Sequence, residues 1–160
     1  MDIDLKKKVL RRIQYGMYVL TSKFGDDVGA GTVNWLSQCS FNPPMVMVGL
    51  KKDSHLLEII KQARSFVANV VGKNQKDLAA SFFRPNQPVD MKINGYSFHY
   101  SAGGGLILVD APAWFECNVT DWLDRGDHLV VLAEVINCGQ SQHPEEDTIL
   151  LRDTGWSYGG

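Results

Sequence analysis

The sequence predicts a mainly β protein, a closed or nearly closed antiparallel β-barrel with two or three short helices at its ends. About seven segments have the composition of strands, and turn sequences join two pairs of them as hairpins. Strands and helices do not alternate regularly, and no GxGxxG motif lies between a strand and a helix, which argues against a Rossmann sheet. We expect a single domain over residues 1–160, a length that can bury one substantial core.

The first quarter of the chain is expected to form a helix and a hairpin. Apolar residues at helical spacing predict a short amphipathic helix over residues 3–13, and these are Leu5, Val9, Leu10 and Ile13. Residues 16–23 and 30–40 have strand composition and are joined by the turn sequence FGDDVG. Residues 45–50 are a continuous apolar run, which is typical of a strand covered on both faces.

The middle of the chain is expected to contain two helices around one strand. Residues 53–64 carry an apolar stripe, and Asp53 or Ser54 can cap the start of this helix. The strand SFVANVV follows, and then a second short helix over residues 73–83 with Asn74 as its cap. Residues 84–105 are rich in Pro, Gly and Asn, so we expect a long loop that contains a small strand, YSFHY.

The last third of the chain is expected to complete the sheet. After LILV, residues 114–122 alternate Phe115, Cys117 and Val119 with polar residues, which is the pattern of a half-buried antiparallel strand. The turn LDRGD leads into the returning strand HLVVLAEVINC, which gives a second hairpin. A short strand TILLR and an aromatic tail end the sequence.

Composition excludes several classes of protein. A hydrophobic fraction of 44%, a charged fraction of 21% and a net charge of −2 are those of a globular protein without a broad basic face, so we expect no nucleic-acid partner. No apolar stretch is long enough to span a membrane, and the charged N-terminus has no signal-peptide core, so we expect a cytoplasmic protein without a membrane partner.

The cysteines and histidines predict neither a disulfide framework nor a metal site. Three cysteines without a CxxC pair fit a reducing compartment. The four histidines, at positions 55, 99, 128 and 143, lack metal-ligand spacing, so no metal is expected. Cys39 has no predictable activating partner, which favours a semi-buried, inert thiol.

A polar strip before Pro43-Pro44 is the first candidate site. A flat polar heterocycle needs hydrogen-bond donors along its edge, and neither proline can donate into a strand ladder, so free backbone groups are expected there. The alternative is a plain crossover between strands, which composition alone slightly favours. The candidate residues are Thr32, Asn34, Trp35, Ser37, Gln38, Cys39 and Ser40.

Two further candidates follow in the chain. Lys51, Lys52, Ser54 and His55 lie at a strand end before a helix, where cations and free backbone N–H groups favour an anion such as phosphate. The alternative is a charged strand exit with Ser54 acting only as a cap. In the second hairpin turn, His128 of RGDH can contact a ligand oxygen, although such a histidine is more often a turn residue.

Taken in order, these segments resemble the flavin reductase-like, FMN-binding split-barrel family. The resemblance rests on YVLTSK, on GAGTVNWLSQCSFNPPMVMVGLKKDS, on ARSFVANVVGKNQKDLAASFF and on AWFECNVTDWLDRGDHLVVLAEV. It is closest to the flavin reductase modules of cyanobacterial flavodiiron proteins and to flavoredoxin. The fold that it implies is an antiparallel split β-barrel of Greek-key type.

The resemblance also implies roles for the candidate residues. It places the strip Asn34–Ser40 along the isoalloxazine ring, Thr32 nearer the ribityl phosphate, and the KKDSH segment at the phosphate. It places His128 at the flavin or nicotinamide side, and Trp156 as a stacking residue. Leu56 stands where members commonly carry a second hydroxyl residue. Members are usually homodimers with flavin sites near the subunit interface.

The implied function is that of an NAD(P)H:flavin oxidoreductase. NAD(P)H would pass a hydride to bound FMN, or FAD, and the electrons would leave to free flavin, an iron centre or a partner protein. Hydride transfer between stacked rings needs alignment above all, so no acid–base residue is expected to be indispensable. The alternative is a flavoredoxin-like electron carrier that does not oxidise NAD(P)H. A flavin-free barrel that binds nucleic acid or a small ligand is disfavoured by the acidic charge.

Overall fold

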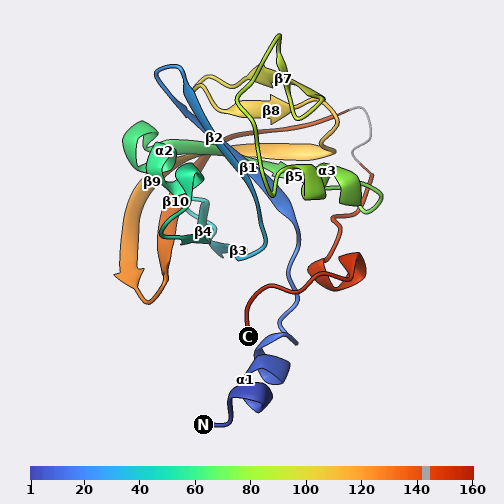
Figure 1. Ribbon diagram of the computed structural model, residues 1–160. Helices are drawn as coiled ribbons and strands as arrows, with labels where there is room; N and C mark the ends of the chain where they lie inside the picture. Colours follow the sequence, from blue (N-terminus) through green and yellow to red (C-terminus); the bar gives the residue numbers. More distant parts are fainter. Residues whose placement is uncertain (142–144) are drawn as a thin grey trace.

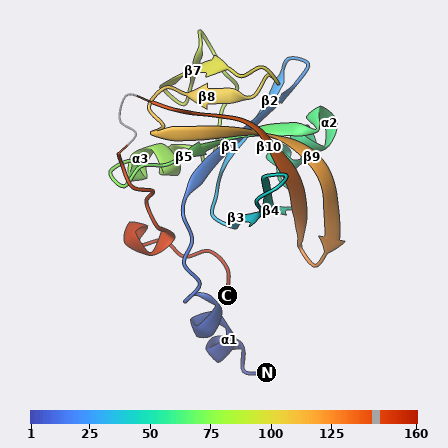
Figure 2. The ribbon, with the colours of Figure 1, turned by 180° about the vertical axis from the view of Figure 1, so that it is seen from behind.

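A curved seven-stranded antiparallel sheet forms most of the molecule, and a three-stranded sheet packs at one end of it (Figures 1 and 2). This computed structural model describes residues 1–141 and 145–160. The order of strands in the large sheet is β2 (Asp27–Val33), β1 (Tyr18–Phe24), β5 (Ser65–Val70), β9 (Ala113–Arg125), β10 (His128–Gln140), β4 (Met45–Lys51) and β3 (Leu36–Ser40). The small sheet contains β6 (Lys92–Ile93), β7 (Tyr96–Tyr100) and β8 (Leu106–Leu108). The helices are α1 (Ile3–Leu10), α2 (His55–Ala63), α3 (Lys76–Ser81) and a 3₁₀ turn, Leu151–Thr154.

The large sheet closes on itself at a two-residue connection. Strands β2 and β3 stand at opposite ends of the strand order, yet only Asn34 and Trp35 separate them in the chain. Because so short a link cannot span a flat seven-stranded sheet, the sheet must roll until its two edges meet. This arrangement confirms the predicted mainly β, antiparallel split barrel with short helices.

Helix α2 forms where the stripe of apolar residues predicts it. Ser54 caps its start by accepting a hydrogen bond from Leu57 N at 3.3 Å, as one of the two predicted caps. Four apolar side chains on one face of the helix are buried against β1 and β2, and these are Leu56, Leu57, Ile59 and Ile60. Burial of each such side chain contributes about 1.5–3 kcal/mol, which fixes the position of the helix start on the barrel.

Two buried polar side chains fasten the small sheet to the large one. Asn69 Nδ2 donates to the backbone oxygens of Val19 and Leu106, at 3.1 and 3.0 Å, while Asn69 Oδ1 accepts from Leu108 N at 2.8 Å. Thr21 Oγ1 donates to Leu106 O at 2.7 Å. Because buried backbone groups need partners, these bonds satisfy backbone groups of β8 on the edge that does not pair with β7.

The predicted single strand over residues 30–40 is wrong. It divides into the end of β2 and the whole of β3, with the break at Asn34–Trp35. The gap in pairing that was expected before the prolines is limited to an irregularity between Gln38 and Ser40, because β3 pairs with β4 on both sides of it and residues 41–44 form a turn. The complete break between strands therefore lies earlier in the chain than the sequence suggested, at Asn34–Trp35, where the rolled edges join.

Burial differs from expectation on two strands, β4 and β9. Val46, Val48 and Leu50 of β4 are buried but Met47 is 42% exposed, so one face of this strand is uncovered in the single chain. Glu116, expected on the solvent side of β9, is 1% exposed because its carboxylate accepts hydrogen bonds from Ser101 Oγ and Gly103 N.

The ends of the chain also depart from the prediction. Helix α1 projects away from the barrel beside the C-terminus (Figure 1), and its predicted apolar face is exposed rather than packed. Helix α3, which was predicted to have Asn74 as its cap, begins after Gln75, so Asn74 does not cap it. Residues 148–152 form two isolated bridges and the start of the 3₁₀ turn instead of a strand. Within the described residues, none of the helices has the length and hydrophobicity needed to cross a bilayer.

Candidate functional site

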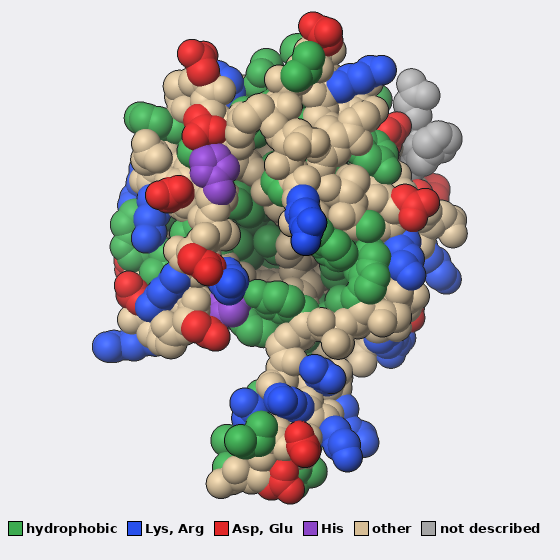
Figure 3. Space-filling view, viewed as in Figure 1, with side chains coloured by type: hydrophobic (Ala, Val, Ile, Leu, Met, Phe, Trp, Pro, Cys, Tyr) green, Lys and Arg blue, Asp and Glu red, His purple; other side chains and the backbone are tan. Residues whose placement is uncertain are grey.

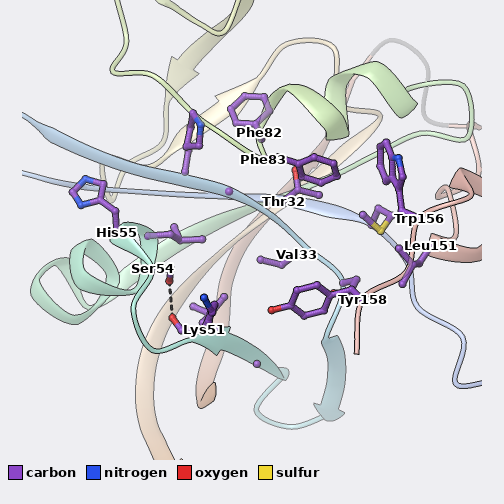
Figure 4. A pocket seen from close by; sticks show the side chains of 18 of the residues that line it. Thr32, Val33, Lys51, Ser54, His55, Phe82, Phe83, Leu151, Trp156 and Tyr158 are labelled. Atoms are coloured by element: carbon purple, nitrogen blue, oxygen red, sulfur yellow. Dashed lines mark hydrogen bonds between the residues drawn. The ribbon is translucent and has the colours of Figure 1, made fainter. Parts of the chain in front are cut away.

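A pocket of about 690 Å³ opens where β2, the end of β4, the start of α2 and the C-terminal tail converge. Figure 3 shows a hollow in this face with apolar side chains gathered in and around it. In the close view, side chains from β2, β4, the segment after α3 and the tail point into a common space (Figure 4). The pocket therefore lies beside the link at which the barrel closes.

The end of the pocket at α2 is its cationic end. Lys51 and Ser54 line it, and Ser54 Oγ donates to Lys51 O at 2.8 Å (Figure 4). Lys51 Nζ lies 3.0 Å from Asp53 Oδ2, and this hydrogen bond and the charge of Asp53 raise the pKa of the lysine. His55 also lines the pocket, with Nε2 3.2 Å from Asp27 Oδ1. A lysine beside a helix N-terminus can bind an anion.

Lys52, which the sequence placed with this group, lies elsewhere. Its ammonium pairs with the carboxylate of Asp124 on β9, and the residue does not line the pocket. Strand β4 ends at Lys51 and Lys52 lies in the following turn, where its N–H donates to Asp127 O at 3.2 Å, so only one lysine of the pair reaches the pocket.

The β2 side of the pocket combines one satisfied and one unsatisfied polar side chain. Thr32 Oγ1 donates to Ala79 O at 2.6 Å, which ties the strand to α3. Asn34 is 6% exposed and lines the pocket, but its Nδ2 has no hydrogen-bond partner among the described residues. A buried donor of this kind costs about 1–3 kcal/mol, so a ligand acceptor beside it would be favoured.

Aromatic rings form the wall opposite Lys51. Trp156 and Phe83 meet edge to face with ring centroids 4.8 Å apart, and Lys76 Nζ lies 5.2 Å from the centroid of Trp156. Phe82, 1% exposed, lines the pocket behind them. Such faces suit a flat ring, because planar groups stack on aromatic side chains at little conformational cost.

Trp35 and His128 lie just outside the pocket and support its wall. The indole packs on Gly49, where a Cβ atom would lie only 3.1 Å from Trp35 Cε3, and its centroid is 4.6 Å from that of His128. His128 Nε2 is 2.7 Å from the hydroxyl of Tyr158, which does line the pocket. Burial raises the pKa of this tyrosine.

The other predicted strip residues do not line the pocket. They occupy β3 at the edge of the sheet, where Ser37, Gln38 and Cys39 are exposed and Ser40 is half-buried. Cys39 is therefore not the semi-buried thiol that was expected. Ser37 Oγ and Gln38 Nε2 donate to backbone oxygens of their own strand, at 3.1 Å each.

Several residues of the pocket were not predicted. Tyr158 is the most consequential, and the aromatic composition of the tail was a signal for it. Phe83 and Gly49 carried no local signal, because their roles depend on which segments meet. The additional lining residues include Met17, Gly49, Phe82, Phe83, Pro85, Leu151 and Tyr158.

No metal centre is visible in the part of the chain that the structure describes. No group of three or more His, Cys, Asp or Glu side chains there could hold a metal ion. His143 lies outside the described residues. The three cysteines are free, and burial raises the pKa of the Cys117 thiol to about 12.

Comparison with known proteins identifies one domain family over most of the chain. The sequence profile of the flavin reductase-like domain matches residues 10–157. The chain is 33% identical over 138 residues to diflavin flavoprotein A 1 of Synechocystis. The aligned residues cover 86% of this chain and 24% of that protein. It thus spans about a quarter of the length of the curated relatives that it matches first.

Solved structures agree with this match. The styrene monooxygenase flavin reductase of Pseudomonas putida S12 is 31% identical, with a TM-score of 0.74, covering 89% of this chain and 88% of that one. The NADH:FAD oxidoreductase of Streptomyces globisporus C-1027 is 23% identical with a TM-score of 0.80, covering 92% of this chain and 86% of that one. The second likeness shows the fold alone.

Proposed function

Because this chain belongs to the flavin reductase-like domain family, we propose that it binds FMN in the pocket beside Asn34 and passes a hydride from NAD(P)H to that flavin. The observation that carries the proposal is the buried Asn34 amide, whose Nδ2 has no partner among the described residues, at the side of an apolar cavity whose far end is cationic. A flavin matches all three features, since it joins a flat ring with polar edges to an anionic phosphate.

The residues present fit such a group. We assign the phosphate to the start of α2, where Lys51 and the free backbone N–H groups favour an anion. We assign the ring to the space between Asn34 and the aromatic pair Phe83 and Trp156. When bound, the flavin supplies the redox chemistry by accepting a hydride on its ring system.

The contribution of this chain is to orient the ring and to exclude water from one side of it. Phe82, Leu151 and Trp156 provide an apolar wall, and the Asn34 amide can hold one polar edge of the ring in register. Alignment of two reacting rings supplies much of the rate enhancement in such transfers, so these positioning contacts are the relevant ones.

We further propose a homodimer whose interface lies next to the pocket. The register of β4, β10 and β9 places Met47 and Leu123, 42% and 56% exposed, on one outward face. The same face continues to Gly49 and Lys51, which line the pocket. A second copy would cover these apolar side chains, and the apolar sequence of β4 would then be buried on both sides.

The electrons then leave the flavin to free flavin, an iron centre or a partner protein. Relatives named as diflavin flavoproteins are several times longer than this chain, which supports an acceptor outside the residues described here. A cytoplasmic location and NAD(P)H as the electron donor belong to the same proposal.

An absorbance spectrum of the purified protein, followed by mass analysis of the released flavin, tests the binding and separates FMN from FAD. Anaerobic mixing with NADH or NADPH then tests the transfer, and bleaching of the flavin band with either nucleotide is expected. Bound flavin that neither nucleotide bleaches would instead indicate the flavoredoxin-like carrier. A colourless protein with no affinity for added FMN would overturn the proposal.

A further inference from the structure

Three polar side chains connect solvent with the wall of the pocket. Asp127 Oδ1 lies 2.7 Å from His128 Nδ1, and His128 Nε2 lies 2.7 Å from the Tyr158 hydroxyl. The Asp127 side chain is 94% exposed and that of His128 only 14%. Tyr158 ends the series inside the pocket, with its hydroxyl turned toward the Lys51 side (Figure 4).

The proton positions in this series follow from what each group can donate. The hydrogen bond to His128, together with its charge, lowers the pKa of Asp127, and an ionised carboxylate can only accept. His128 Nδ1 therefore carries a proton, and Nε2 is free to take either of two states. With a neutral ring, Nε2 accepts and the Tyr158 hydroxyl must donate to it. With a charged ring, Nε2–H donates, and the hydroxyl proton of Tyr158 can point into the pocket.

The surroundings hold this geometry in place. The ring of Trp35 lies against both His128 and Tyr158, with centroid distances of 4.6 and 5.2 Å. The tail beyond Tyr158 is fastened by Arg11 Nε, which donates to Gly159 O at 3.2 Å. Gly159 packs on the same indole, where a Cβ atom would lie 2.8 Å from Trp35 Cζ2. Tyr158 is thus held against His128 from two sides.

We propose that Tyr158 contacts the bound flavin through its hydroxyl and that His128 is the positioning residue that decides whether this hydroxyl donates or accepts. This inference rests on the proposed function and deepens it. A flavin ring edge presents carbonyl oxygens and unprotonated nitrogens but only one N–H group, so a donating tyrosine suits it better than an accepting one. Flavin affinity should accordingly rise when His128 becomes charged.

Other charged groups near this series also enter its pH dependence. The ammonium of Lys51 and the carboxylate of Asp53 act on Tyr158, and Asp53 also acts on His128. Lys52 acts on Asp127. None of the three is a hydrogen-bond partner of His128, whose ring nitrogens are both engaged within the series.

Riboflavin is the probe for the test, because it lacks the phosphate, whose own titration would add a pH dependence. Its dissociation constant is measured by fluorescence between about pH 5.5 and about pH 8.5, the range in which histidine side chains ordinarily change charge. We expect the intact chain to bind about three- to tenfold more tightly at the acidic end, the worth of one hydrogen bond.

The variants separate the roles of the three residues. Tyr158→Phe and His128→Gln should lose the pH dependence. At every pH their affinity for riboflavin should equal the affinity of the intact chain at the alkaline end of the range. Asp127→Asn keeps an acceptor for His128 Nδ1, so it should keep the pH dependence that the other two variants lose, a difference in pH profile that a purely structural role would not produce. Tyr100→Phe, on exposed β7 away from the pocket, is the matched control and should follow the intact chain.

Tyr158→Phe keeps the ring that packs on Trp35, so it provides the decisive comparison even if His128→Gln fails to fold. If the riboflavin affinity of Tyr158→Phe follows the same pH profile as that of the intact chain, this inference is overturned but the proposed function is not. Affinity that rises with pH overturns it as well. No binding of riboflavin or FMN by the intact chain at any pH overturns both the inference and the proposed function.

Discussion

Replacing Asn34 with leucine should change the stability and the flavin affinity of this protein in opposite directions. Asn34 is 6% exposed, and its Nδ2 has no partner among the described residues. Leucine has the same branching and the same number of side-chain heavy atoms, although its methyl groups are bulkier, and it has no polar group to satisfy. The substitution removes a buried unsatisfied donor, whose burial costs about 1–3 kcal/mol.

The expected gain in the flavin-free protein is smaller than that cost, because leucine does not repack without some strain. We expect Asn34→Leu to raise the free energy of unfolding by about 1 kcal/mol, measured by urea denaturation. In the flavin complex the amide should have a partner, so its loss should weaken binding about tenfold, which corresponds to about 1.4 kcal/mol.

Asn69→Leu is the matched control, since it makes the same chemical change at a satisfied amide. Asn69 makes three hydrogen bonds to buried backbone groups, so its loss should destabilise the protein by about 3 kcal/mol or more. The reasoning on Asn34 fails if Asn34→Leu also destabilises the flavin-free protein by more than about 1 kcal/mol and leaves flavin affinity unchanged. That result would make its amide a structural group.

Ser54→Asp keeps a helix cap but adds a negative charge at the assigned phosphate site, so FMN should bind at least about tenfold more weakly while riboflavin binding changes little; equal effects on both flavins would contradict the phosphate assignment. Cys117 should resist alkylation in the folded protein while the two exposed cysteines react, because burial raises its pKa to about 12. The fold favours the neutral thiol, so the contribution of Cys117 to stability is complete below its ordinary pKa of 9.0 and is lost as the pH rises toward about 12. Urea midpoints on both sides of this pH range measure the loss. Equal alkylation of all three thiols in the folded state would contradict the burial of Cys117. Met47→Glu should convert the proposed dimer to monomers in sedimentation experiments, whereas Val109→Glu, an equally exposed apolar position, should not; a dimer that survives Met47→Glu would place the interface elsewhere.

Local pattern was sufficient for the elements that pack through one regular face. The stripe that begins at Leu56 predicted α2 and its burial, and Ser54 was recognised as one of two possible caps. The hairpin of β9 and β10 followed from alternation on either side of a turn. In these segments the residues that decide the structure lie within a few positions of each other. The spacing of apolar residues and the capping residues are therefore enough to predict the helix or strand.

Alternation failed where a distant segment changes the surroundings of a side chain. Glu116 is polar and its position in the alternation of β9 predicts exposure, yet Ser101 and Gly103 from the loop between β7 and β8 donate to its Oε1 and the side chain is buried. Conversely, Met47 is apolar but lies on an uncovered face of β4. Neither outcome is encoded in the strand itself.

The sequence by itself determined most of the helices and strands, the position of the α2 start and the set of polar residues from which a site could be built. Only the tertiary structure decided which of them share a pocket. Rolling of the sheet brings Asn34 and Lys51 to the same pocket, while Lys52, in the turn after β4, pairs with Asp124 instead. The tail then brings Tyr158 to His128 across thirty residues of sequence. Contacts at such separations depend on how the whole chain buries its apolar surface, which no local period specifies.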